Sequence, residues 1–245
     1  MVFDGKKFAE GIIAKLPKKK AKLAIFLDPD NVSGAKYVEK KIQLAARLGV
    51  ELKILNSKSE ISNKSQIQNL NQDPGITGIM IQLPFPNSQE LINLIDPKKD
   101  VDGLRNDSPY LPAVVRAVKE VLLSLQEDLL QKKMVVVGCK GFVGQKLLKV
   151  LGFRFQVLGM DKDDFDPEKI KSADVIISTT GQAGLIKSKM VKPGVIAIDV
   201  GYPKGDFDPQ VAAKASFFTP VPGGVGPVTV VMLFQNLLKG YNLKR

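Results

Sequence analysis

The segment Met134-Val-Val-Val-Gly138-Cys-Lys-Gly141-Phe-Val-Gly144 decides how the second half of the chain folds. Its apolar residues are typical of a buried parallel strand, and the glycines after them predict a tight turn into a helix. The same order of strand, glycine turn and helix occurs where N–H groups at a helix start bind a pyrophosphate. Because the spacing is G-x-x-G-x-x-G and not the usual G-x-G-x-x-G, a glycine turn without a nucleotide stays an alternative.

Short apolar runs alternate with longer amphipathic runs on both sides of this segment. The second half is expected to contain strands at 134–137, 155–158, 175–178, 195–200 and 217–219, and a helix at 142–151. The first half is expected to contain strands at 23–27, 52–55 and 78–83, and helices at 6–16, 35–48, 62–70 and 88–95. This alternation predicts an α/β fold, and the second half resembles a Rossmann nucleotide-binding unit.

The stretch 96–112 is the best candidate for a domain boundary, because its three prolines and four aspartates interrupt regular structure. We expect an N-terminal α/β catalytic domain at 1–110, completed by 228–245, and a Rossmann-type dinucleotide-binding domain at 111–227. A long helix at 113–130 is expected to follow the boundary, and a last helix at 228–243, after a Pro/Gly-rich segment, is expected to return the chain to the first domain.

The composition narrows the chemistry. With 245 residues, 44% of them hydrophobic, the chain is long enough for two modest domains. It has no histidine, which excludes Ser-His-Asp and Cys-His nucleophiles and histidine metal ligands. Its single cysteine, Cys139, excludes an intramolecular disulfide and a cysteine-rich zinc site. We therefore expect no metal, and acid–base chemistry that uses Lys, Tyr, Asp or Glu.

The net charge of +11 favours anionic partners, which include nucleic acids, phosphorylated cofactors and polycarboxylate substrates. The lysines are dispersed apart from 18–20, and no tryptophan accompanies them, so we expect no nucleic-acid partner. The segment Met1-Val-Phe-Asp-Gly-Lys-Lys has no apolar core, and no run approaches the roughly 20 apolar residues of a membrane span. We expect no membrane association and, with one thiol, a cytoplasmic location.

The helix expected at 35–48 carries a lysine on its apolar side. That side is formed by Val38, Ile42, Leu44, Ala45 and Leu48. Helical periodicity places Lys41 in its middle, with Tyr37 one turn earlier. One interpretation is that the lysine methylenes cover the core while the ammonium reaches water. The other is that burial lowers the pKa of Lys41 toward neutrality, so that it serves as an acid or base beside the Tyr37 phenol.

Two further segments place polar groups where ligands often bind. Gly78-Ile-Met-Ile-Gln82-Leu-Pro-Phe-Pro86 ends an apolar strand with a carboxamide, at the position where open α/β sheets present binding groups. Lys98-Lys-Asp-Val-Asp102-Gly103 supplies two carboxylates in one turn. Taken alone, the two segments are also compatible with a polar strand end and an ordinary Asx turn.

These segments together resemble one family. Tyr37-Val-x-x-Lys41, Gln82-Leu-Pro-x-Pro and Lys99-Asp-Val-Asp102-Gly are similar to signature segments of bifunctional methylenetetrahydrofolate dehydrogenase/methenyltetrahydrofolate cyclohydrolases. Thr219-Pro-Val-Pro222-Gly-Gly-Val-Gly-Pro-Val-Thr229 resembles the family's C-terminal signature almost residue for residue. The resemblance implies oxidation of 5,10-methylenetetrahydrofolate with NAD(P) and hydrolysis of the methenyl product to 10-formyltetrahydrofolate.

The resemblance also implies a role for each signature residue. Lys41 is the implied acid–base group of the hydrolysis, with Gln82 and Tyr37 supporting it. Asp102 is implied to accept hydrogen bonds from the pterin. The residues implied to let backbone approach the folate are Pro222, Gly223 and Gly224. The implied cofactor residues are Gly138, Cys139, Lys140, Gly141, Asp161, Lys162, Gly181 and Tyr202. A homodimer formed through the cofactor domain is implied as well.

The cofactor half departs from the family pattern. Cys139-Lys140 stands where the family usually has Arg-Ser, and Asp161-Lys162 where it usually has His-Ser. Asp161 follows an expected strand, where a carboxylate binds a ribose diol and repels a 2′-phosphate. This favours NAD over NADP, although Lys140 and Lys162 are still able to receive a phosphate. Pro109-Tyr-Leu-Pro112 and Tyr202 also differ from the family.

These departures leave alternatives open. One is a cyclohydrolase that has lost its dehydrogenase activity. A second is another Rossmann dehydrogenase acting on a small metabolite, which leaves Lys41, Gln82 and Asp102 unexplained. A third is a basic nucleic-acid-binding or regulatory protein.

Overall fold

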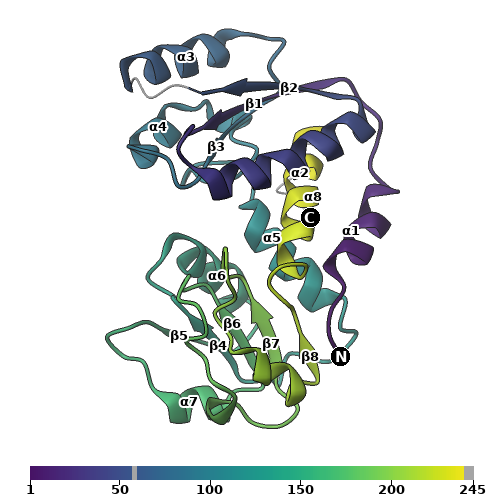
Figure 1. The fold of residues 1–245 in the computed structure, drawn as a ribbon, viewed down its shortest axis with the longest axis vertical. Coiled ribbons are helices and arrows are strands. Elements are labelled where there is room, and N and C mark those ends of the chain that lie inside the picture. Colours follow the sequence, from purple (N-terminus) through teal and green to yellow (C-terminus); the bar gives the residue numbers. More distant parts are fainter. Residues whose placement is uncertain (57–59, 240–245) are drawn as a thin grey trace. The chain divides into compact units, whose positions relative to one another are not determined.

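The structure is a computed structural model that describes residues 1–56 and 60–239. The chain divides into two compact units. The three-stranded unit consists of Ile12–Ala113 and Val230–Arg245, and the five-stranded unit consists of Met1–Gly11 and Val114–Thr229. Each unit contains one parallel sheet with helices packed on it, so the predicted α/β class is confirmed (Figure 1).

The three-stranded unit has the strand order β2-β1-β3. Its strands are β1 (Ala21–Leu27), β2 (Val50–Leu55) and β3 (Gly78–Gln82). Its helices are α2 (Val32–Leu48), α3 (Glu60–Gln72), α4 (Ser88–Leu94) and the 3₁₀ helix η1 (Pro97–Lys99). Leu27 pairs with Gln82 in parallel register, so the carboxyl ends of β1 and β3 meet at one edge of the sheet.

Helix α2 has one buried side, which faces the unit's core. Its buried residues are Gly34, Val38, Lys41, Leu44, Ala45 and Leu48. The expected apolar side is therefore confirmed, with the exception of Ile42, which is 44% exposed. Ile42 lies about 100° around the helix from Lys41, beyond the edge of the buried stripe.

The five-stranded unit has the strand order β5-β4-β6-β7-β8. Its strands are β4 (Met134–Val137), β5 (Val157–Met160), β6 (Val175–Ser178), β7 (Ile196–Asp199) and β8 (Phe217–Phe218). Its helices are α6 (Phe142–Gly152), α7 (Pro167–Ser172) and the 3₁₀ helices η2 (Ser188–Met190) and η3 (Pro209–Ala213), preceded by α5 (Ala113–Leu123). The strand order reverses between β4 and β6, and sheets of this kind bind ligands at the carboxyl ends of such a strand pair.

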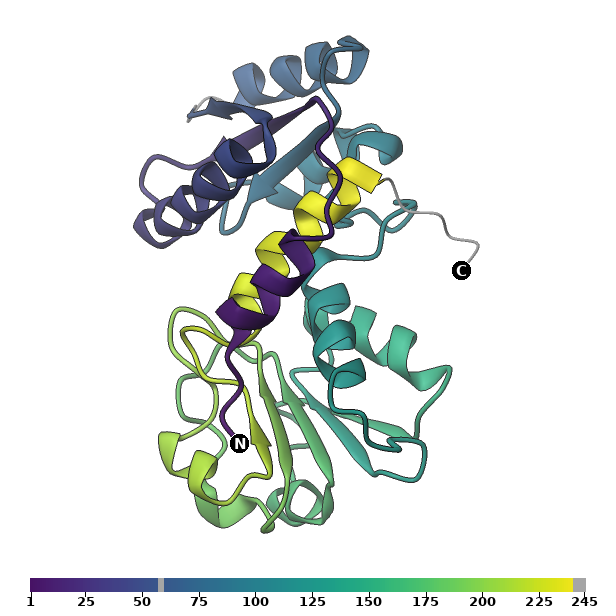
Figure 2. The ribbon, with the colours of Figure 1, turned by 90° about the vertical axis from the view of Figure 1, so that its right-hand side faces the viewer.

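The N-terminal residues extend the five-stranded sheet at β8 (Figure 2). Val2 forms a parallel bridge with Phe218, and the Phe3 N–H donates to the Phe218 carbonyl at 2.8 Å. Residues 1–11 therefore group with the five-stranded unit, whereas the expected division placed them in the first domain. Helices α1 (Gly5–Ile13) and α8 (Val225–Lys239) each begin in the five-stranded unit and end in the three-stranded one. The end of the helix expected at 228–243 lies outside the described residues.

Most elements differ from their expected bounds by one to three residues, and two of the differences have a clear structural reason. Helix α5 ends at Leu123 and not at residue 130, because the Ser124 hydroxyl donates to the Val121 carbonyl at 2.6 Å and the chain then turns. Strand β5 begins two residues later than expected and includes Gly159. A Cβ at Gly159 would lie 3.1 Å from the Cys139 sulfur, so only glycine allows this strand to approach the glycine turn so closely. Within residues 1–56 and 60–239, no helix combines the length and apolar character of a transmembrane span.

Candidate active site

Lys41 and Gln82 meet inside the three-stranded unit. Lys41, on α2, is only 4% exposed, and its ammonium donates a hydrogen bond to Gln82 Oε1 at 2.6 Å. Gln82 ends β3, and its own amide group donates to the Leu83 carbonyl at 3.1 Å, which orients the carboxamide. The ammonium is thus desolvated and paired, and it does not extend into water as a surface lysine does.

The Tyr37 ring lies beside the same ammonium. The distance from Lys41 Nζ to the ring centroid is 4.9 Å, and the distance from Lys40 Nζ to that centroid is 5.4 Å. A cation–π contact of this kind stabilises an ammonium by about 0.5–2 kcal/mol. The ring therefore offsets part of the cost of burying the charged form of Lys41.

Burial changes the pKa of two neighbouring groups in opposite directions. Desolvation lowers the pKa of Lys41 to about 8, and the negative charge of Asp102 opposes this fall. Desolvation raises the pKa of Asp102 to about 6, where the Lys41 charge opposes the rise and the Asp100 charge adds to it. The two groups titrate on either side of neutrality, and perturbed pairs of this kind are typical of acid–base sites.

The turn that carries Asp102 is organised by Asp100. Asp100 is 1% exposed, and its carboxylate accepts hydrogen bonds from the Leu104 N–H at 3.2 Å and the Arg105 N–H at 2.8 Å. Burial raises the pKa of Asp100, and these N–H groups limit the rise. Asp100 therefore holds the backbone of the turn, while the half-buried Asp102 is the carboxylate coupled to the lysine.

Two further side chains fix this turn within the unit. The Lys99 ammonium donates to three backbone carbonyls that follow or end α3, at 2.7 to 2.8 Å. Asn236, on α8 and 0% exposed, donates through Nδ2 to the Val101 carbonyl at 2.8 Å. The peptide between the two aspartates is thereby held by a helix that is distant in the sequence.

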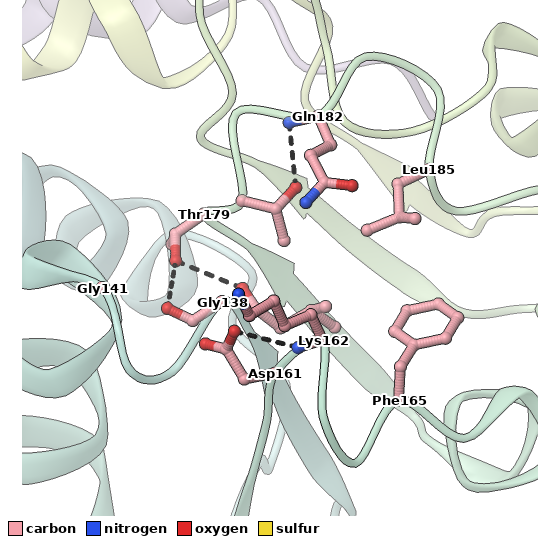
Figure 3. A pocket seen from close by; sticks show the side chains of 10 residues that line it. Gly138, Gly141, Asp161, Lys162, Phe165, Thr179, Gln182 and Leu185 are labelled. Carbon is pink, nitrogen blue, oxygen red and sulfur yellow. Dashed lines mark hydrogen bonds between the residues drawn. The ribbon is translucent and has the colours of Figure 1, made fainter.

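A pocket of about 340 Å³ lies at the carboxyl ends of β4 and β6 in the five-stranded unit (Figure 3). Its lining residues are Val137, Gly138, Gly141, Asp161, Lys162, Phe165, Thr179, Thr180, Gln182 and Leu185. Gly138 has a left-handed φ of 85°, and a Cβ there would lie 2.9 Å from Thr179 Oγ1. The Thr179 hydroxyl is 3.2 Å from the Gly138 carbonyl, to which it donates. The glycine turn is thus required by both conformation and close approach.

Asp161 follows β5 directly and contributes a charged wall to the pocket (Figure 3). Its carboxylate accepts the Lys140 N–H at 2.8 Å and the Lys162 N–H at 2.9 Å, and these bonds lower the pKa of Asp161. Each carboxylate oxygen keeps a lone pair for a further donor such as a ribose hydroxyl. The Lys140 ammonium pairs with Asp163 at 2.8 Å. The pocket therefore suits part of a dinucleotide in its strand-end position and in its polar groups.

The structure brings four of the expected cofactor residues together in this lining, namely Gly138, Gly141, Asp161 and Lys162. In the described part of the chain, Cys139, Lys140, Gly181 and Tyr202 do not line it. Sequence reasoning missed Phe165, Thr179, Thr180, Gln182 and Leu185. The two threonines directly follow β6, so their strand-end position was a usable signal. Phe165 and Leu185 reach the pocket from irregular segments, for which the sequence gives no such signal.

Pro222, Gly223 and Gly224 lie in the five-stranded unit at the start of α8. Gly223 has a φ of 108°, and a Cβ at Gly224 would lie 2.6 Å from the Pro220 carbonyl oxygen. The Gly5 N–H donates to the Gly223 carbonyl at 3.0 Å. Both glycines are therefore required by the local backbone, independently of any ligand.

Many α/β enzymes have parallel sheets with polar groups at the strand ends. The pocket lies where the strand order reverses, which is the position at which such sheets bind nucleotides. Residues 3–102 match the family described as "Tetrahydrofolate dehydrogenase/cyclohydrolase, catalytic domain", and residues 112–245 match "Tetrahydrofolate dehydrogenase/cyclohydrolase, NAD(P)-binding domain". The chain belongs to the tetrahydrofolate dehydrogenase/cyclohydrolase family.

Individual relatives are similar along the whole chain. The chain is 34% identical to "Bifunctional protein FolD" from Hydrogenobaculum sp. (strain Y04AAS1) over an alignment of 272 positions, with 98% of each chain covered. Its fold is similar to that of the bifunctional methylenetetrahydrofolate dehydrogenase/cyclohydrolase from Campylobacter jejuni, with a TM-score of 0.89, 29% identity and 98% of each chain covered. The corresponding enzyme from Trypanosoma brucei, solved with NADP and an inhibitor, has a TM-score of 0.89 and 26% identity over 98% of this chain and 97% of that one.

Proposed function

We propose that this chain oxidises 5,10-methylenetetrahydrofolate with a nicotinamide dinucleotide and hydrolyses the methenyl product to 10-formyltetrahydrofolate. Membership of the family supports both reactions. Among the chain's own residues, the observation that carries the proposal is the hydrogen bond of 2.6 Å from the buried Lys41 to Gln82, with Asp102 coupled to the same lysine.

Lys41 is the proposed acid–base group of the hydrolysis. With a pKa of about 8, about a quarter of the Lys41 side chains are neutral at pH 7.5. The neutral amine accepts a proton from the water whose oxygen bonds to the methenyl carbon. The ammonium returns that proton to N5 of the pterin as the bond from N5 to this carbon breaks, and the remaining proton of the former water leaves the hydroxyl for solvent as the formyl carbonyl forms. Gln82 orients the amine, and the Tyr37 ring stabilises its charged form.

Asp102 is the proposed partner of the pterin. A carboxylate accepts hydrogen bonds from both the amino group and a ring N–H of that heterocycle. Its pKa of about 6 leaves it mostly ionised at neutral pH, as this role requires. The backbone at Pro222, Gly223 and Gly224 is proposed to approach the folate as well, since two of these residues have no side chain.

The pocket of the five-stranded unit is the proposed cofactor site, and the nicotinamide ring supplies the hydride acceptor when it is bound. Gly138 and Gly141 let the backbone approach the pyrophosphate. Asp161 binds the adenosine ribose, beside Lys162. The further proposed cofactor residues are Cys139, Lys140, Gly181 and Tyr202.

We propose that NAD is preferred over NADP. The Asp161 carboxylate stays charged, because N–H groups lower its pKa, and it therefore repels a 2′-phosphate while accepting from a ribose diol. The ammonium of Lys140 is already paired with Asp163. NADH is expected to bind about tenfold more tightly than NADPH in fluorescence titrations, and Asp161→Ser is expected to reduce this ratio. Tighter binding of NADPH by the unmodified chain would contradict the preference.

Further proposals concern organisation. Residues 1–110 with 228–245 are proposed to act as the folate half, although residues 1–11 group with the five-stranded unit, and residues 111–227 are proposed to act as the cofactor half. The family resemblance supports a homodimer, for which light scattering should give about twice the chain mass of 26.7 kDa. A single cysteine in the whole chain supports a reducing compartment, the cytoplasm, which cell fractionation tests.

Purified chain supplied with 5,10-methylenetetrahydrofolate and NAD, then NADP, is expected to develop the absorbance of the methenyl product. Hydrolysis of added methenyltetrahydrofolate is measured separately. Lys41→Met is expected to reduce this hydrolysis at least 100-fold, whereas Lys40→Met, an exposed neighbour, should not. Rapid hydrolysis without oxidation by either cofactor would indicate a cyclohydrolase alone, and full hydrolysis by Lys41→Met would contradict the proposed site.

A further inference from the structure

A fully buried carboxylate, Asp206, contacts the segment that forms one wall of the dinucleotide pocket. Asp206 is 0% exposed. Its Oδ2 accepts three hydrogen bonds, from the Ser178 hydroxyl at 2.7 Å, the Thr180 N–H at 2.7 Å and the Gly181 N–H at 3.3 Å. One oxygen atom therefore accepts hydrogen bonds from three of the four residues 178–181, where the chain leaves β6.

These donors belong to the part of the chain that turns into the pocket. Ser178 is the last residue of β6, and Thr179, Thr180 and Gln182 line the pocket (Figure 3). Gly181 has a left-handed φ of 66°, and the Gln182 N–H donates to the Thr180 hydroxyl at 3.1 Å. The backbone N–H groups at positions 180 and 181 have left the sheet ladder, so Asp206 supplies the acceptor that the sheet no longer provides.

Asp206 is itself held by a second buried carboxylate. Asp199, at the end of β7, is 1% exposed. Its Oδ1 accepts the Gly201 N–H at 2.9 Å and the Asp206 N–H at 3.0 Å, and its Oδ2 accepts the Phe207 N–H at 3.1 Å. Burial raises the pKa of Asp199, and the Asp206 charge adds to the rise. The loop from 201 to 207 is thereby fixed to one strand end, and through Asp206 to the next.

The hydrogen bonds of Asp206 indicate that its carboxylate fixes the position of the neighbouring backbone. Burying a carboxylate is costly unless hydrogen bonds compensate, and charged acceptors form the stronger bonds. Oδ2 has three donors, whereas Oδ1 is buried without a hydrogen-bond partner among the described residues. All three donors to the carboxylate therefore lie at the end of β6 or in the pocket wall directly after it. The backbone of that wall in turn depends on Asp206 for its acceptor.

We propose that Asp206 is a positioning residue for dinucleotide binding, which holds the backbone of Thr180 and Gly181 so that the wall formed by residues 179–182 exists before the cofactor arrives. The proposal rests on the proposed function only in assuming that this pocket binds a nicotinamide dinucleotide. Asp206 does not line the pocket, so its effect passes through the backbone that it orders. A preformed wall spares the binding step the cost of ordering that segment.

The test compares Asp206→Ala, Asp206→Asn and the control Asp208→Ala in the full-length chain. Asp208 caps η3 through the Gln210 N–H at 3.0 Å, pairs with Lys187 at 3.7 Å and is not among the residues that line the pocket. Dissociation constants for NADH and NADPH are measured by fluorescence titration, and hydrolysis of methenyltetrahydrofolate is measured without dinucleotide. Asp206→Ala is expected to raise the dissociation constant of the better dinucleotide at least tenfold. Asp206→Asn, which keeps one oxygen acceptor, is expected to raise it about threefold, and the control less than twofold.

Hydrolysis separates a local role from a general loss of folding, because its proposed acid–base residues, Lys41 and Gln82, belong to the three-stranded unit. It is expected to stay within twofold of the unmodified chain in all three variants. Equal dinucleotide affinity in Asp206→Ala and the unmodified chain would overturn the proposal. Equal losses of binding and hydrolysis in Asp206→Asn would overturn it too. Failure of the unmodified chain to bind either dinucleotide would instead refute the proposed cofactor site, and the positioning role with it.

Amide exchange gives a second measurement, which needs no variant to fold. In the unmodified chain without dinucleotide, the N–H groups of Thr180 and Gly181 are expected to exchange at least 100-fold more slowly than unstructured amides, because Asp206 accepts both. Exchange of both at the rate of an open loop would refute a preformed wall, whatever the binding data show.

Discussion

The substitution Asp102→Asn tests the electrostatic coupling of the proposed hydrolytic site directly. In the unmodified chain, desolvation lowers the pKa of Lys41 to about 8, and the Asp102 charge prevents a larger fall. Asparagine keeps the shape of the side chain and removes this charge. Because a nearby opposite charge raises the pKa of a lysine by about 1 to 3, the pKa of Lys41 is expected to fall from about 8 to about 7 or below.

The consequence is large at working pH. With a pKa of about 8, about three quarters of the Lys41 side chains are protonated at pH 7.5, and with a pKa of about 7 only about one quarter are. A fall of one pKa unit destabilises the charged form of Lys41 relative to the neutral form by about 1.4 kcal/mol. Because the neutral amine accepts the proton of water, the acidic limb of the hydrolysis profile should move to lower pH by the same shift in pKa, in addition to the weaker folate binding that loss of the carboxylate causes.

Carbon-13 NMR of chain labelled at lysine Cε, followed from about pH 6 to about pH 11, measures the pKa of Lys41 without substrate. Its resonance is assigned by its absence in Lys41→Met. Asp73→Asn is the matched control, since it removes an equal charge from the same unit at an exposed residue whose carboxylate accepts the nearby Gly75 N–H. An unchanged or higher pKa of Lys41 in Asp102→Asn, or an equal fall in the control, would refute the coupling.

Three further outcomes are expected. Because folding lowers the pKa of Lys41 from 10.5 to about 8, this residue's contribution to stability rises between those two pH values, by at most about 3 kcal/mol, and urea titrations of Lys41→Met should lack that rise. Gln82→Leu removes the acceptor of the buried ammonium and should slow methenyltetrahydrofolate hydrolysis about tenfold or more, as stopped-flow absorbance can measure. Gly144→Ala places a Cβ against the Gly138 carbonyl oxygen and should weaken NADH binding and lower the thermal midpoint, whereas Gly152→Ala, in the same helix with nothing within 4 Å, should do neither.

Much of the fold was predictable because it is encoded locally. The segment from Met134 to Gly144 carries its strand, turn and helix in consecutive residues, and the structure has all three there. Strand β5 lies two residues later than the predicted strand at 155–158, and it contains Gly159, although glycine weakens a strand interior. The reason for Gly159 lies in tertiary packing, since a side chain there would contact the Cys139 sulfur and the Leu148 side chain. Such a reason is absent from local sequence.

Some residues of the candidate sites were likewise predictable from local sequence, and others were not. Helical periodicity placed Lys41 on the apolar side of its helix, and the end of an apolar strand placed Gln82. Periodicity left open whether the ammonium reached water, and its 2.6 Å contact with Gln82 shows that it is held inside the unit. Thr180 followed a predicted strand but was not selected. Asp206 could not be selected, because its partners are 25 to 28 residues away in the chain and meet it only through the register of β6 and β7.

Asp100 and Asp206, which lie in different units, both hold a loop by accepting hydrogen bonds from its backbone N–H groups. Each lies in a loop, is almost without solvent exposure, and accepts backbone N–H groups that no strand or helix satisfies. A carboxylate that contacts ligand, as proposed for Asp102, loses its function equally in Asn and Ala variants when charge is what the ligand needs. A carboxylate that holds backbone loses more in the Ala variant, because Asn keeps an oxygen acceptor. The ratio of the two effects, and not the loss of binding alone, therefore distinguishes residues that touch folate or dinucleotide from residues that shape their sites.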